Sequence, residues 1–204
     1  MTRRLALACA LTAAGCVPQA QLSPDVVVRL QRDARVEIYD RENDLAIARG
    51  RADDVRVRQE QVRRQLDELE GFTKQVKARL AKNENGAEQA ASFGRTLAAK
   101  RAFLLVQLRQ LDAQLAAAEA QSGVAYARLE QTRQRQLVIT GRALQSSLER
   151  FDQSVEAADE RVRDAERREA DARLEAERAF GNWKAAEDEY ARSTGDYDTG
   201  IWID

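Results

Sequence analysis

A heptad repeat of mostly apolar residues between positions 27 and 80 constrains the fold more than any other feature of this chain. Its steps alternate between four and three residues, and this average spacing of 3.5 places the repeat on one side of an α-helix. One series is Gln31, Ile38, Leu45, Ala52, Gln59, Leu66, Thr73 and Leu80, and the other is Val27, Ala34, Arg41, Ala48, Val55, Val62, Leu69 and Val76. So long a seam must be buried against other helices, with Gln31, Arg41 and Gln59 as polar interruptions that weaken it and limit alternative registers.

Two further heptad runs follow in the second half of the chain. The first comprises Leu104, Leu108, Leu111, Leu115, Ala118, Ser122, Ala125, Leu129, Thr132, Gln136 and Ile139. The second comprises Leu144, Leu148, Phe151, Val155, Ala158, Val162, Ala165, Glu169, Ala172, Ala176, Ala179, Trp183, Ala186 and Tyr190. The runs are out of phase by one residue around Thr140-Gly141, and such a slip requires a local distortion or a break in the helix.

These runs predict an all-α fold, either a long antiparallel coiled-coil hairpin or an elongated three-helix bundle. We expect a helix over 24–82, which Ser23 caps, a turn at 83–86 and helical structure over 87–192. A turn at Gly141 would give three helices of similar length. The apolar flanks of Gly141 contain none of the polar residues typical of a loop, and this favours a continuous or kinked helix instead.

Composition narrows the range of functions. The chain has 204 residues, of which 33% are charged and only 5% aromatic, and this mixture is typical of long helices. Its net charge of −1 argues against nucleic acid as a partner, because phosphate binding needs concentrated positive charge. Histidine is absent, and no phosphate-binding loop or nucleophile motif occurs. We therefore expect no catalytic residues, no metal, no cofactor and no small-molecule substrate.

The N-terminus carries a targeting signal that ends at a cysteine. Arg3 and Arg4 precede a short apolar run, and Ala13, Ala14 and Gly15 lead into Cys16. Two other interpretations of this pattern are a signal peptide that is cleaved at another position and an N-terminus that is apolar by chance. Residues 1–15 resemble a bacterial lipoprotein signal peptide, which implies cleavage before Cys16 and acylation of its thiol, with palmitate among the attached chains. Loss of both arginines would bring the net charge from −1 to −3.

The lipoprotein resemblance also implies a location. Val17 stands where lipoproteins of the inner membrane of enteric bacteria carry Asp, which implies the periplasmic side of the outer membrane. Residues 16–23 are expected to form a lipid-anchored tether. Residues 193–204 are expected to form a flexible tail, in which Ile201, Trp202 and Ile203 either fold back on the bundle or dock a protein partner.

The sequence thus predicts a non-catalytic, lipid-anchored coiled-coil spacer or adaptor of the bacterial cell envelope, with a protein partner and possible homo-oligomerisation. Its layout resembles the small murein lipoprotein, although Asp204 stands where that family has the lysine that is linked to peptidoglycan. One alternative is a periplasmic holdase chaperone that resembles the Skp-like proteins. Another is a regulatory coiled coil for a wall hydrolase or an efflux assembly.

Overall fold

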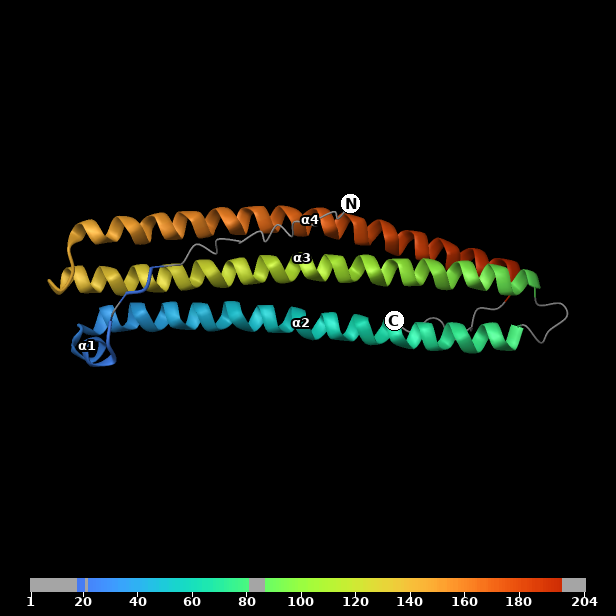
Figure 1. Ribbon diagram of the computed structural model, residues 1–204, viewed down its shortest axis with the longest axis horizontal. Coiled ribbons are helices and arrows are strands. Elements are labelled where there is room, and N and C mark those ends of the chain that lie inside the picture. The colour runs from blue at the N-terminus through green and yellow to red at the C-terminus, as the bar shows by residue number, and fades with distance from the viewer. Residues whose placement is uncertain (1–17, 21, 81–86, 196–204) are drawn as a thin grey trace, which may run out of the picture.

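The computed structural model describes residues 18–20, 22–80 and 87–195, and within these ranges the protein is all-α. A short helix, α1 (Pro24–Arg29), precedes three long helices, α2 (Arg32–Leu80), α3 (Ala87–Ile139) and α4 (Leu148–Thr194), and a 3₁₀ turn, η1 (Gln145–Ser147), leads into α4. Figure 1 shows the long helices side by side, with α3 in the middle. Both α2 and α4 pack along α3 but make few contacts with each other. The fold is therefore the elongated three-helix arrangement.

The predicted seam of α2 is the face that packs against the bundle. Its buried apolar residues all belong to the two predicted series, and they are Ile38, Leu45, Ala48, Ala52, Val55, Val62 and Leu69. Gln59 is also buried, and its side-chain amide donates a hydrogen bond to Asp112 Oδ1 on α3 over 2.8 Å. The polar interruption at Gln59 is thus satisfied by a specific partner, which favours one register between the helices.

The predicted seam of α4 is also confirmed at its largest residues. Phe151, Ala158, Ala176, Trp183 and Tyr190 are all buried, and they recur at heptad spacing along the helix. The α4 helix ends at Thr194, and Gly195 follows in the left-handed conformation with φ of +70°. This is the helix end that the sequence places just before the C-terminal tail.

Helix α3 is buried on two sides because it lies between the other two helices. One side carries Leu104, Leu111, Ala118 and Leu129 from the predicted run. The second side was not predicted, and its buried residues are smaller or polar: Thr96, Lys100, Ala117, Val124, Ala127 and Gln134. Thr96 donates a side-chain hydrogen bond to the Ala186 carbonyl of α4 over 3.1 Å. Such a side gives no clear apolar periodicity, which explains why it escaped detection.

Of the two alternatives at Gly141, the structure has the turn and not the continuous or kinked helix that the apolar flanks favoured. Gly141 has φ of +70°, its N–H donates to the Val138 carbonyl over 2.9 Å, and the Arg142 N–H donates to the Leu137 carbonyl over 2.8 Å. This pair of bonds is the Schellman arrangement that terminates helices at a left-handed glycine. Leu137 is buried in a cluster with Phe151, so the apolar residues before the turn hold the helix end in place.

The predicted helix over 24–82 is also interrupted near its start. Leu30 is extended, with ψ of 155°, and it separates α1 from α2. This break turns the Leu30 side chain into a buried cluster with Ile38, Leu45 and Leu129. Ser23 occupies the predicted cap position of α1, but its side chain makes no capping hydrogen bond. The turn predicted at 83–86 lies outside the described residues.

Candidate interaction sites

The four predicted site residues lie outside the described residues. These are Cys16, the predicted lipid attachment site, and the predicted docking residues Ile201, Trp202 and Ile203. The structure therefore bears on these sites only through the residues next to them in the chain.

Residues 18–20 and 22, which we name the N-terminal strap, lie against the bundle. Ala20 is buried and packs with Leu137 and Phe151, at the end of the molecule where α3 turns into α4. Leu22 packs against the neighbouring cluster that contains Leu30 and also reaches the Ala20 cluster. The chain just after the predicted anchor is thus fixed to the rod by its own packing.

A buried carboxylate holds the strap. The Ala20 N–H donates to Glu130 Oε2 over 2.6 Å, and the Glu130 side chain is completely buried. Arg133, one turn later on α3, donates to Glu130 Oε1 over 2.7 Å and to Glu42 Oε1 of α2 over 2.7 Å. Burial lowers the pKa of Arg133, but the hydrogen bond to Glu42 and the charge of Glu130 outweigh this effect and raise the pKa. One charged network therefore joins the strap, α3 and α2.

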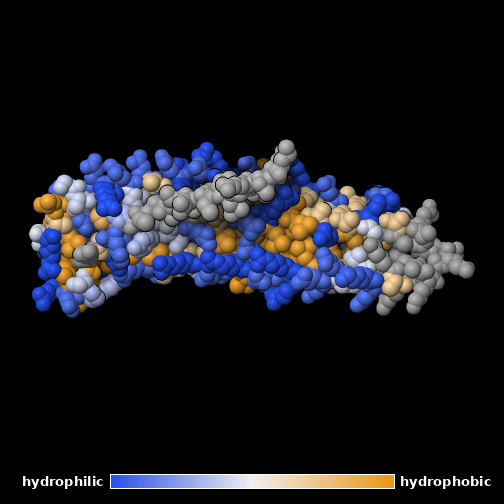
Figure 2. Space-filling view, viewed as in Figure 1, coloured by the Kyte–Doolittle hydropathy of each residue, from blue (hydrophilic) through white to orange (hydrophobic). Residues whose placement is uncertain are grey.

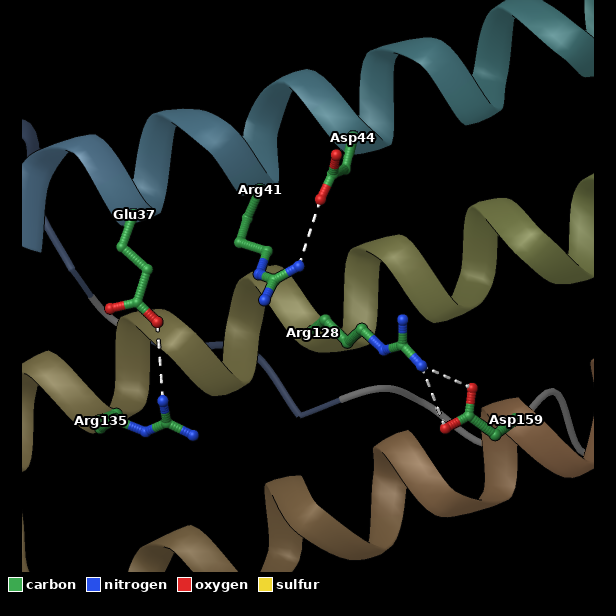
Figure 3. A network of polar contacts seen from close by, with 6 residues as sticks. All are labelled: Glu37, Arg41, Asp44, Arg128, Arg135 and Asp159. Atoms are coloured by element: carbon green, nitrogen blue, oxygen red, sulfur yellow. Dashed lines mark hydrogen bonds and ion pairs between the residues drawn. The ribbon is translucent and has the colours of Figure 1, made fainter.

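More exposed ion pairs connect all three long helices near the same end (Figure 3). Arg135 of α3 lies 3.5 Å from Glu37 of α2, and Arg128 of α3 lies 3.1 Å from Asp159 of α4. Asp159 thus pairs across the interface between α3 and α4. Exposed pairs of this kind add little stability, so they act mainly on register and orientation.

A shallow groove crosses α3 in the gap between α2 and α4. Its volume is about 430 Å³, and a second hollow of about 250 Å³ continues it past Arg51 and Gln121. The groove is lined by Arg41, Asp44, Ile47, Ala48, Arg51, Gln121, Val124, Ala125, Arg128, Asp159 and Val162. An open trough with apolar side chains between charged ones suits the apolar face of another helix better than an enclosed small molecule.

An aromatic cluster lies towards the other end of the bundle. Trp183 stacks on Phe103 with ring centroids 5.4 Å apart, and Phe180 meets both rings edge-on. The ammonium groups of Lys100 and Lys184 lie 4.8 and 4.5 Å from the Trp183 ring centroid, which is cation–π distance. Trp183 is almost fully buried in the core, as its heptad position predicted, whereas Phe180 at the edge of the cluster is 43% exposed.

The described residues contain no group of three or more potential metal-ligating side chains and no helix long and apolar enough to cross a membrane. Compared with models of known families, with characterised proteins and with solved structures, the chain finds no match. The strap site was missed from the sequence because Glu130 lies beside Leu129 in the heptad and resembles any flanking surface charge.

Proposed function

We propose that the protein is a non-catalytic, lipid-anchored coiled-coil spacer or adaptor of the bacterial cell envelope. The observation that carries this proposal is the strap, which begins two residues after Cys16 and is held on α3 by the buried Glu130. Acyl chains on Cys16 would anchor the protein stably in a membrane. Because the strap is fixed to the bundle, that anchor would position the whole rod and not merely keep it near the membrane.

The dimensions of the rod suit a spacer. Helix α3 has 53 residues, which at 1.5 Å per residue corresponds to a length of about 80 Å. Both flanking helices pack along α3, so the rod is stiffer than a single helix of that length. In the periplasm, such a rod would present its far end to partners well away from the anchoring membrane, whereas its groove lies nearer to the strap.

The packing favours an adaptor over a holdase chaperone. A holdase with helical arms clamps clients between arms that stand apart. Here α2 and α4 both lie against α3, with buried residues over most of the length of each helix. The groove between α2 and α4 is narrow and lined with charges of both signs, as expected for a site that recognises one helix and not many unfolded chains.

The anchor is tested first with Cys16→Ser expressed in the native bacterium. Labelled palmitate should enter the wild-type protein and be absent from the variant, which should leave the membrane fraction because its only acylation site is gone. A serine conserves the size of the side chain, so folding should be unaffected, and circular dichroism of the purified variant checks this. Lipid labelling that persists in the variant would refute the assignment.

The adaptor role is tested by photo-cross-linking in intact cells. A photoreactive residue replaces Ile47, which lines the groove, or Leu174 of α4, which lies outside it; the two side chains are 50% and 54% exposed. An adaptor should give one or two discrete cross-linked products at position 47 and none at position 174. Cross-links from both positions to a broad range of unfolded envelope proteins would refute the adaptor role and support the holdase role.

A further inference from the structure

The end of the bundle that carries the strap also exposes apolar side chains to solvent. Among the described residues, the three most exposed large apolar side chains are Leu144, Ile139 and Val28, at 77%, 69% and 68%. Ile139 is the last residue of α3, Leu144 follows in the turn, and Val28 lies on α1 at the same end (Figure 1). Figure 2 shows apolar atoms at this left-hand end of the rod. We name Val28 and residues 139–144 the anchor-end tip.

The chain brings Cys16 close to this tip. Pro18 lines a surface cavity of about 750 Å³ together with Arg142, Ser146 and Arg150, so the strap and the α3–α4 turn share one hollow. Cys16 precedes Pro18 by two residues, and two extended residues span at most about 7 Å. A lipid attached to Cys16 would therefore start within about 7 Å of Pro18 at the edge of this hollow, which would hold the tip near the membrane surface.

We propose that the anchor-end tip inserts into the interface of a phospholipid membrane and sets the rod upright on it, an inference that rests on the proposed acylation of Cys16. Leu144 and Ile139 would enter the region between headgroups and acyl chains, where exposed apolar side chains are favoured. Arg142 and Arg150 are exposed and form no ion pair within the described part of the chain, which leaves their guanidinium groups available for lipid phosphates.

Apolar contact, and not net charge, carries this interaction. Glu149 lies in the first turn of α4 and Asp152 follows it one turn of sequence later, and the two carboxylates offset the charges of Arg142 and Arg150. The carboxylate of Asp152 accepts a hydrogen bond from Gln131 over 2.7 Å, so it is directed towards α3. A tip without excess charge should insert into neutral and anionic bilayers to similar extents, because no long-range attraction to the surface contributes.

The inference is tested on the acylated protein in phosphatidylethanolamine–phosphatidylglycerol vesicles. Cys9 is removed with the signal and Cys16 is acylated, so a cysteine introduced as Leu144→Cys is the only thiol that an environment-sensitive fluorophore can label. The matched control is Leu174→Cys, an exposed leucine in the body of α4. Nitroxide-labelled lipids should quench the fluorophore at position 144 several-fold more strongly than at position 174.

The two possible failures are distinguishable. Equal quenching at positions 144 and 174 in vesicle-bound protein would overturn the inserted tip and leave the lipid anchor standing. Protein that does not bind vesicles at all would overturn the anchor, and with it this inference. Both substituted leucines are exposed, so the variants should keep the helical content and thermal unfolding of the unlabelled protein, which circular dichroism verifies before the vesicle experiment.

Discussion

The buried carboxylate of Glu130 should contribute a large share of the stability at the anchor end, and Glu130→Ala measures that share. The substitution removes the acceptor for the Ala20 N–H and one of the two partners of Arg133. A hydrogen bond to a buried charged group contributes about 1.5–3 kcal/mol. Arg133 keeps its bond to Glu42, which limits the second loss. We therefore expect the free energy of unfolding to fall by about 3 kcal/mol, at the lower edge of the range for a broken buried pair.

A graded series separates the charge of Glu130 from its shape. Glu130→Gln keeps an oxygen that can accept from the Ala20 N–H but loses the charge, so the cost should be about 1–2 kcal/mol. The control is Glu177→Gln on α4, whose pair with Arg173 has side chains 57% and 70% exposed and should contribute less than about 0.5 kcal/mol. All variants are compared in a Cys16→Ser background by urea unfolding, followed by circular dichroism.

Hydrogen exchange shows in which part of the molecule Glu130→Ala lowers the stability. If Glu130 holds the strap, Glu130→Ala should increase amide hydrogen exchange at Ala20 and Leu22 far more than in the middle of α2 or α4. A stability within about 0.5 kcal/mol of the parent, or exchange that rises evenly along the whole rod, would refute the assignment of Glu130 to the strap.

Two further comparisons test the turn and the seam. Gly141→Ala should lower the free energy of unfolding by about 1 kcal/mol because alanine is strained at φ of +70°. The control, Gly123→Ala inside α3, should raise it by about 0.5–1 kcal/mol, since a Cβ there meets nothing within 4 Å. Chemical denaturation measures both, and a gain in stability from Gly141→Ala as large as that from Gly123→Ala would contradict the turn. Leu111→Asp should prevent stable folding by burying an unpaired charge, and Leu66→Asp should have a smaller effect because Leu66 is only partly buried. The control, Leu174→Asp, should change the melting temperature little because Leu174 is exposed. Equal melting temperatures for all three variants would mean that the register is wrong.

The heptad pattern predicted the outer helices well because each buries one face. In α2 the buried apolar residues all come from the predicted series, and in α4 the pattern located Phe151, Trp183 and Tyr190 correctly. Helix α3 is different because it must satisfy two neighbours. Its second side uses small and polar residues such as Thr96 and Ala127, which are read from sequence as ordinary surface positions.

Two local features were not settled by the pattern, for a different reason. The turn at Gly141 depends on a single left-handed residue. Its flanking residues are apolar although Ile139 and Leu144 are exposed, and only Leu137 among them is buried, so they did not resemble a polar loop. The strap depends on a contact between Ala20 and Glu130, which are 110 positions apart. The phase slip of the heptad marked a distortion near Gly141 but could not distinguish a turn from a kink, and a lone long-range hydrogen bond leaves no periodic trace in a sequence.

The central position of α3 has a consequence for how the protein comes apart. Because α2 and α4 hardly touch each other, the molecule is two helical interfaces that share one helix, like a very short repeat array in which each unit meets only its neighbours. The stability of such an array is close to a sum of its interfaces, so either outer helix can detach while the other stays in place. A partner helix could then replace α2 or α4 on α3 without unfolding the rest, which would give the protein a second, exchangeable state built from the same contacts.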